Sequence, residues 1–140
     1  MPLVSITRLR VRRRRFLPAF LIQALRSALE ARRATGNLSV ALLADRDRTY
    51  WTRTLWRDEV AMRAFMTTGV HRRVMPRLLE WCDEAALVHW LGEAGEPPSW
   101  AEAHRRLVAD GRASKVKHPS EAQRRFAIPP PRHGATLSLK

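Results

Sequence analysis

The stretch from Tyr50 to Trp90 constrains the fold of this chain most, because strand-like and helix-like patterns alternate along it in a fixed order. Its first run, RTYWTRTLW (48–56), is aromatic and rich in threonine, which is typical of a β-strand. Asp58 and Glu59 then open a helical pattern, since acidic residues favour the start of a helix. The apolar run AALVHWL (85–91) closes the stretch as a buried strand.

The first half of the chain repeats this order. Residues 3–11 (LVSITRLRV) are β-branched and aliphatic and predict a strand, and residues 17–33 carry apolar side chains at helical spacing. A second strand over 38–44 is joined to 48–56 by three polar residues, a length suited to a hairpin. The order βαββαβ predicts an α+β, ferredoxin-like fold with one antiparallel sheet and both helices on one face.

The segment YWTRTLWRDEVAMRAFMTTGVHRR, followed by LVHW, resembles the second half of the sequences in the antibiotic-biosynthesis-monooxygenase-like families. The resemblance implies a dimeric α+β barrel, in which the sheets of two copies meet face to face. The predicted order also leaves one sheet face bare, and a bare apolar face must find a partner. We therefore expect a homodimer. The similarity to spheroidene monooxygenase-like proteins is looser.

The composition changes after Gly92, which divides the chain into a ferredoxin-like domain (1–92) and a C-terminal extension (93–140). Ser99 and Glu102 match a capping box and predict a helix that ends near Asp110. The remainder is basic and rich in proline, so it is expected to be extended or partly disordered. Its possible anchor points are Val116, Phe126 and Ile128.

The net charge of +13 is concentrated at the two ends of the chain. Residues 1–15 contribute six arginines and no acid, and residues 111–140 contribute seven Lys/Arg against one glutamate, which leaves +1 for the middle. The cluster Arg12–Arg15 has no assigned role. Basic ends could hold nucleic acid, but the first strand lacks the aromatic residues of an RNA-binding sheet, so nucleic acid is not the expected partner.

No run of apolar residues is long enough to span a membrane, and the apolar stretch near Phe20 does not have the form of a secretory signal. The single cysteine, Cys82, lies in an apolar run and is expected to be a small buried residue. A reducing cytoplasm fits this composition.

Alternate side chains of the predicted strand 48–56 point to opposite faces of the sheet. On each face, bulky side chains are mixed with hydrogen-bonding groups, as in the lining of a small-molecule cavity. The alternative is that these side chains pack in the core. His71 and His89 are candidates for a general base or an iron ligand. The candidate catalytic residues are His71, His89, Tyr50 and Arg53, and the candidate substrate-binding walls are Trp51, Trp56, Phe65 and Trp90.

The resemblance implies a monooxygenase that oxygenates a small aromatic or polyene molecule with O₂, either without a cofactor or with haem held by His71 or His89. The haem-degrading pattern is not met, because Asn37 lies in a loop and Phe65 occupies the tryptophan position. No metal-ligand spacing, phosphate-binding glycine loop or serine-nucleophile motif is present. The alternative function is a non-enzymatic homodimer that binds a small apolar ligand or, through its basic ends, nucleic acid.

Overall fold

The computed structural model describes residues 1–93, 96–132 and 135–140, and its first seven main elements follow the predicted βαββαβ order. The second predicted helix consists of two pieces, and the last predicted strand begins three residues earlier than expected. The elements are β1 (Leu3–Val11), α1 (Leu17–Arg33), β2 (Asn37–Ala44), β3 (Thr49–Trp56), α2 (Glu59–Met66), α3 (Gly69–Trp81) and β4 (Cys82–Leu91), with a short 3-10 turn η1 (Arg14–Phe16) before α1.

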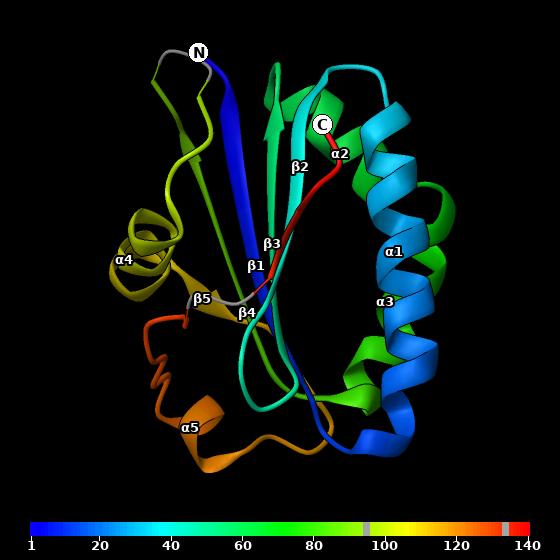
Figure 1. The fold of residues 1–140 in the computed structure, drawn as a ribbon, viewed down its shortest axis with the longest axis vertical. Coiled ribbons are helices and arrows are strands. Elements are labelled where there is room, and N and C mark those ends of the chain that lie inside the picture. Colours follow the sequence, from blue (N-terminus) through cyan, green and yellow to red (C-terminus); the bar gives the residue numbers. More distant parts are fainter. Residues whose placement is uncertain (94–95, 133–134) are drawn as a thin grey trace.

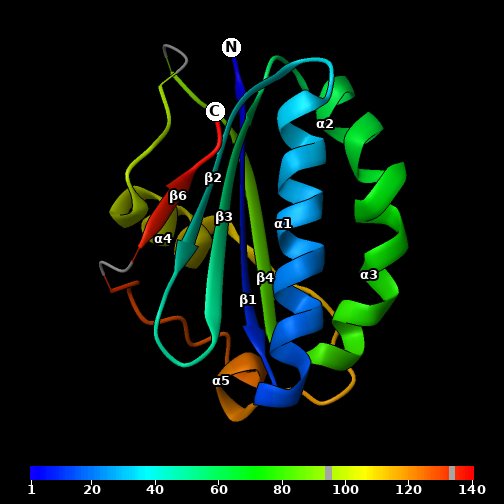
Figure 2. The same cartoon turned by 45° about the vertical axis from the view of Figure 1, so that its right-hand side comes forward.

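The strands form one antiparallel sheet in the order β5-β4-β1-β3-β2-β6, with β1 in the interior. Figure 1 shows α1, α2 and α3 on one side of this sheet and α4 (Trp100–Asp110) and α5 (Glu121–Arg124) on the other. Figure 2 shows the same separation from a second direction, with α1 between the sheet and α3. The predicted α+β ferredoxin-like fold is therefore confirmed.

Local sequence features place the boundaries of these elements. The Asp58 side chain caps α2 by accepting a hydrogen bond from the Ala61 amide at 2.9 Å. The β2–β3 hairpin turns through Asp47 and Arg48, both with positive φ angles of 55° and 57°. Gly36 has a φ of 86°, and a Cβ built there would lie 2.6 Å from the Cβ of Ala61, so this turn requires glycine.

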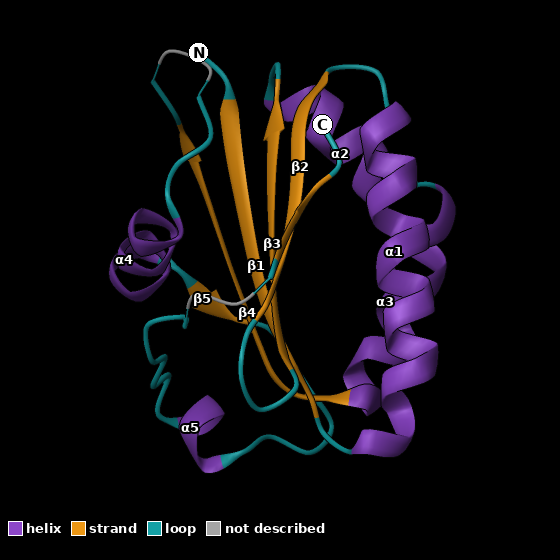
Figure 3. Ribbon diagram, viewed as in Figure 1, coloured by secondary structure: helices purple, strands orange, loops and turns teal. Residues whose placement is uncertain are grey.

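The sheet face opposite α1–α3 is covered by the chain's own C-terminal extension, as the two-sided arrangement in Figure 3 illustrates. Ala103 and Leu107 of α4 pack on this face and are fully buried. The expectation of a bare face was wrong, because helix α4 supplies the apolar cover that the sequence assigned to a second copy. A homodimer stays a prediction. The sheet residues buried in this cluster are Val4, Ile6, Leu43, Trp51, Leu55, Ala86 and Val88.

The tail beyond α4 is more ordered than the sequence predicted. Strand β5 (Arg112–Ala113) pairs with β4, and β6 (Thr136–Ser138) pairs with β2, so the extension adds one short strand to each edge of the sheet. The Gln123 side chain bonds both backbone groups of Ala85 at 3.0 Å and fixes α5 to β4. The three predicted anchor points are confirmed: Phe126 and Ile128 pack under α4, and Val116 packs beside Cys82.

Part of the N-terminal arginine cluster is structural. Arg12 forms an ion pair with Glu80 at 3.0 Å, whereas Arg13, Arg14 and Arg15 are exposed. Within β1, Arg8 forms a buried ion pair with Glu84 at 2.8 Å. Within the described residues, no helix is long and apolar enough to cross a membrane.

Candidate functional site

An apolar cavity of about 410 Å³ lies between the sheet and the helical layer. Strands β1, β3 and β4 form its floor, and helices α1, α2 and α3 form its roof. A volume of this size matches the pockets that hold small organic molecules. Five of the eight predicted site residues line it: Tyr50, Trp56, Phe65, His71 and His89.

The strand register places polar side chains in rows across the floor of the cavity. Each cross-strand row takes one residue from β4, one from β1 and one from β3, and side chains two residues apart on a strand share a face. The central strand β1 contributes two hydroxyl groups to this floor. The three rows are His89–Ser5–Thr54, Leu87–Thr7–Thr52 and Ala85–Leu9–Tyr50.

One end of the cavity is built by three stacked rings. The centroids of Trp56 and Phe65 are 5.3 Å apart with 29° between the ring planes, and the ring of His71 lies 5.3 Å from Phe65 in a tilted arrangement. The indole of Trp56 donates a hydrogen bond to the Thr54 hydroxyl at 2.9 Å. Aromatic packing of this kind fixes ring orientation, so the position of His71 is set by α2 as well as by its own helix.

The His71 ring is oriented by a backbone contact. Its Nδ1 lies 3.2 Å from the carbonyl oxygen of Met66, which accepts a hydrogen bond when Nδ1 carries the proton. In the neutral ring this leaves the lone pair on Nε2. Burial lowers the pKa of His71, partly opposed by the contact with the Met66 carbonyl and by Glu30. The imidazole is therefore neutral at neutral pH and can accept a proton at Nε2.

His89 lies at the same end of the cavity, in the first floor row, beside Ser5. Burial lowers its pKa, and the positive charges of Arg112 and Arg63 lower it further. Like His71 it is neutral at neutral pH. The two imidazoles are therefore the basic groups of an otherwise apolar and hydroxyl-lined region.

Tyr50 lies at the other end of the floor. Its ring packs against Phe20 with centroids 5.3 Å apart, and burial raises the pKa of its hydroxyl, so the phenol stays protonated. The rows of Tyr50 and His89 are four residues apart along β1, which corresponds to about 13 Å. Tyr50 and the histidines thus lie at opposite ends of the cavity floor.

The structure does not bring the remaining three predicted residues into this cavity. Trp51, Arg53 and Trp90 lie on the opposite sheet face, because strand residues of the other parity point away from α1–α3. The Arg53 guanidinium donates a hydrogen bond to the Pro98 carbonyl at 2.7 Å and stacks 4.7 Å from the centre of Trp100. The expectation that Arg53 acts together with the histidines is corrected by this placement.

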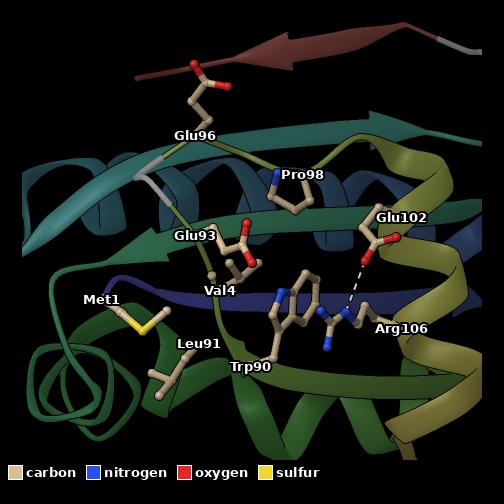
Figure 4. Close-up of a pocket in the computed structure, with 10 residues that line it drawn as sticks. Met1, Val4, Trp90, Leu91, Glu93, Glu96, Pro98, Glu102 and Arg106 are labelled. Atoms are coloured by element: carbon tan, nitrogen blue, oxygen red, sulfur yellow. Dashed lines mark hydrogen bonds and ion pairs between the residues drawn. The ribbon is translucent and has the colours of Figure 1, made fainter.

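Trp90 lines a second hollow of about 380 Å³ beside α4 (Figure 4). The Arg106 guanidinium lies 5.1 Å from the centre of the Trp90 ring and also donates to Glu102 at 3.0 Å. Glu93 and Glu96 also line it. Since Trp90, Arg106 and Glu102 of this hollow are engaged with one another, the larger apolar cavity is the candidate functional site.

Sequence reasoning missed several residues of the cavity. Ser5 and Thr7 are the polar members of one face of an otherwise aliphatic strand, and that alternation in residues 3–11 was the available signal. The extension contributes Ser114, Lys115 and Val116 at one sheet edge and Leu137 at the other. No local pattern indicates these contacts, because they depend on where the tail returns to the sheet.

The described residues contain no group of three His, Cys, Asp or Glu side chains that could hold a metal ion. Haem needs only one protein ligand to its iron, and the free Nε2 of His71 and the ring of His89 are chemically suited to that role. A cofactor-free site and a haem site are both compatible with this donor set.

Comparisons with solved structures agree on the fold. The chain is similar to the structure entitled SnoaB, a cofactor-independent oxygenase from Streptomyces nogalater, with 18% identity and a TM-score of 0.57 over 66% of this chain and 94% of that one. It is also similar to Rv0793 from Mycobacterium tuberculosis, with 14% identity and a TM-score of 0.61 over 67% and 97% of the two chains. A putative antibiotic biosynthesis monooxygenase from Nitrosomonas europaea gives 16% identity and a TM-score of 0.57 over 66% and 90%.

These likenesses confirm the antibiotic-biosynthesis-monooxygenase-like fold that the sequence predicted. A comparison with curated protein sequences finds no match. One protein-family model, described as a domain of unknown function (DUF3291), matches residues 23–119 and so includes β2, β3, β4 and α4. The chain therefore belongs to the DUF3291 family and has the fold of the antibiotic-biosynthesis-monooxygenase-like proteins.

Proposed function

We propose that the protein binds a small aromatic or polyene molecule in the cavity between sheet and helices and oxygenates it with O₂. The observation that carries the proposal is the His71 imidazole, which faces an apolar cavity with its Nδ1 engaged at 3.2 Å by a backbone carbonyl. A neutral base in water-poor surroundings can remove a weakly acidic C–H proton. The structural relatives, one of which is titled a cofactor-independent oxygenase, support the same reaction class.

The chemistry needs few groups from the protein. A polycyclic substrate with an acidic C–H gives its proton to the Nε2 of His71 or to His89, and the resulting carbanion transfers an electron to O₂. Trp56 and Phe65 provide walls against which a flat ring can stack. The hydroxyls of Ser5 and Thr54, in the same row as His89, can donate to the developing oxyanion.

Anthrone tests the reaction, because it has such a C–H group and its oxidation is balanced as anthrone plus O₂ giving anthraquinone plus water. We expect O₂ uptake and anthraquinone formation above the rate without protein. His71→Gln should lower this rate by about 10²-fold or more, the usual contribution of a general base. His118→Gln is the control, since that ring is exposed and does not line the cavity. Equal rates in all three proteins would contradict the proposal.

A titration with haem decides between the two forms of the oxygenase. If iron is bound by the cavity, a Soret band should develop with saturation and be lost in His71→Gln or His89→Gln. If turnover of anthrone proceeds without any such band, the protein acts without the cofactor. In either case the histidine that matters is identified by the variant that loses the signal.

The second candidate function is binding without chemistry. It is favoured by the distance of about 13 Å between the Tyr50 row and the His89 row, which separates the phenol from the two bases. In that case anthrone should quench the fluorescence of Trp56 on binding, yet O₂ uptake should equal that of the solution without protein.

A further inference from the structure

The cavity differs in charge between its two ends. The end near His89 holds two imidazoles, and both are neutral at neutral pH. The other end, near Tyr50, is bordered by the segment Ser114–Val116 of the extension. Lys115 is the one residue with a permanent charge among the described residues that line the cavity.

Backbone contacts hold Lys115 at this rim. The Ser114 amide donates to the Ala85 carbonyl at 2.9 Å, and the Lys117 amide donates to the Leu79 carbonyl at 2.9 Å. The segment between them therefore bridges strand β4 and the last turn of α3. The Gln123 side chain adds a third tie by donating to the Ser114 carbonyl at 3.0 Å. The backbone at Lys115 is thus fixed at the edge of the cavity, and its side chain is exposed.

The charge of Lys115 is not neutralised by its neighbours. Its near neighbour Lys117 approaches Glu80 at 3.8 Å, and Glu80 is also bound by Arg12. The carboxylates of Asp83 and Glu84 are taken up by Arg10 and Arg8. Within the part of the chain that the structure describes, no carboxylate forms an ion pair with Lys115. An uncompensated cation at the mouth of an apolar cavity attracts an anionic group on the ligand.

On these grounds we propose that the cavity takes an apolar molecule with one terminal carboxylate, which lies at Lys115 while the oily part extends toward His71 and His89. This inference rests on the proposed function and names the class of its ligand. The four-residue separation of the Tyr50 and His89 rows, about 13 Å, sets the length between the acid group and the carbon near the imidazoles. The neutral floor and the apolar roof disfavour a second charge on the ligand.

Retinoate and retinol test the inference, because they share one polyene skeleton and differ in the head group alone. Binding is measured at pH 7.5 by quenching of tryptophan fluorescence in the full chain. We expect retinoate to bind about fivefold more tightly than retinol, as befits a partly exposed ion pair. Added salt should reduce this preference, because it screens the charge at the rim.

Matched variants assign the preference to one side chain. Lys115→Ala should abolish the preference for retinoate over retinol, whereas Lys115→Arg should keep it. Lys117→Ala is the control, because this lysine lies two residues away, faces Glu80 and does not line the cavity. Equal binding of the two probes by the wild type, or a preference that survives Lys115→Ala, would overturn the inference and leave the proposed function standing. Binding of neither probe would contradict the proposed function as well.

Discussion

His71 and His89 show how apolar surroundings set the chemistry of single side chains. Burial is the largest cause of the lowered pKa of both imidazoles, and for His71 the Met66 carbonyl also fixes the ring. A lowered pKa keeps these groups unprotonated where histidine in water would begin to titrate. Both residues can therefore act as bases at neutral pH, and both make folding sensitive to acid.

The lowered pKa of His71 has a definite sign for stability. Between the ordinary histidine pKa of about 6.5 and the lower folded value, the unfolded chain binds more protons than the folded one. The contribution to the free energy of unfolding is thus full above pH 6.5 and is lost as the pH falls through that window. We expect His71→Gln to lose less stability than the wild type between pH 7.5 and pH 5 in urea unfolding.

The control for this measurement is His118→Gln, in which an exposed histidine is changed. This variant separates the loss of an exposed imidazole from the loss of a buried one. If His71→Gln and the wild type have the same pH dependence, then the apolar surroundings of His71 do not affect its protonation.

Cys82 is a residue for which burial suppresses reactivity. The side chain is fully buried beside Val11 and Phe20, and burial, with a smaller contribution from Asp83, raises its pKa to about 12. A thiol reagent at pH 8 should label the folded protein on the order of a thousandfold more slowly than the urea-unfolded chain, since the thiolate is the reacting form. Rapid labelling of the folded protein would show that this part of the core opens readily.

Among the elements, α4 has the least expected role. A helix that the sequence assigned to a separate extension buries Ala103 and Leu107 in the same cluster as residues of β1, β3 and β4. The Ser99 hydroxyl accepts a hydrogen bond from the Glu102 amide at 3.1 Å, which confirms the predicted start of this helix. The division at residue 92 is a proposal about sequence organisation, and the packing joins the two parts into one core.

Leu107 provides the test of this packing. Leu107→Ala should lower the free energy of unfolding by about 2–5 kcal/mol, because it leaves a cavity between α4 and the sheet. The neighbouring Val108 is 49% exposed, so Val108→Ala should change the free energy by less than about 0.5 kcal/mol. Urea unfolding followed by circular dichroism measures both. A small loss for Leu107→Ala would mean that α4 is only loosely attached.

For the whole molecule, the extension performs two tasks. It covers the sheet face that a ferredoxin-like sheet leaves bare, and it adds Ser114–Val116 and Leu137 to the two edges of the cavity. The same cover disfavours RNA binding on that face, since RNA-binding sheets of this topology present it to solvent. The predicted homodimer, if it forms, must use another surface or displace α4.

Removal of residues 93–140 tests the first of these tasks. The shortened chain would expose Val4, Ile6, Leu55 and Val88, and apolar faces of this size associate. We expect the shortened chain to sediment as a dimer or a larger species. The full chain, measured at the same concentration, is the reference. In any shortened chains that dissociate into monomers, Trp51 should be exposed to water, because α4 no longer buries it, and its emission should shift to the red. A shortened chain that stays monomeric with an unshifted spectrum would show that the cover is dispensable.

The sequence alone determined where most of the helices and strands lie and which strand residues share a face. Alternating apolar patterns placed β1–β4 and the helices, the capping residues Asp58 and Ser99 placed helix starts, and strand parity grouped Tyr50 with Trp56. These features depend on residues close together in the chain, so periodicity and hydrogen-bonding preferences are enough to find them.

Only the tertiary structure decided which groups meet. Parity could separate Tyr50 from Arg53, but it could not tell that α4 covers the face of Arg53 while the histidines share the face of Tyr50. The register of β1 against β3 and β4, and the return of residues 114–117 and 136–138 to the sheet edges, join segments up to a hundred residues apart. Contacts of this kind arise from packing of the whole chain, which no local pattern encodes.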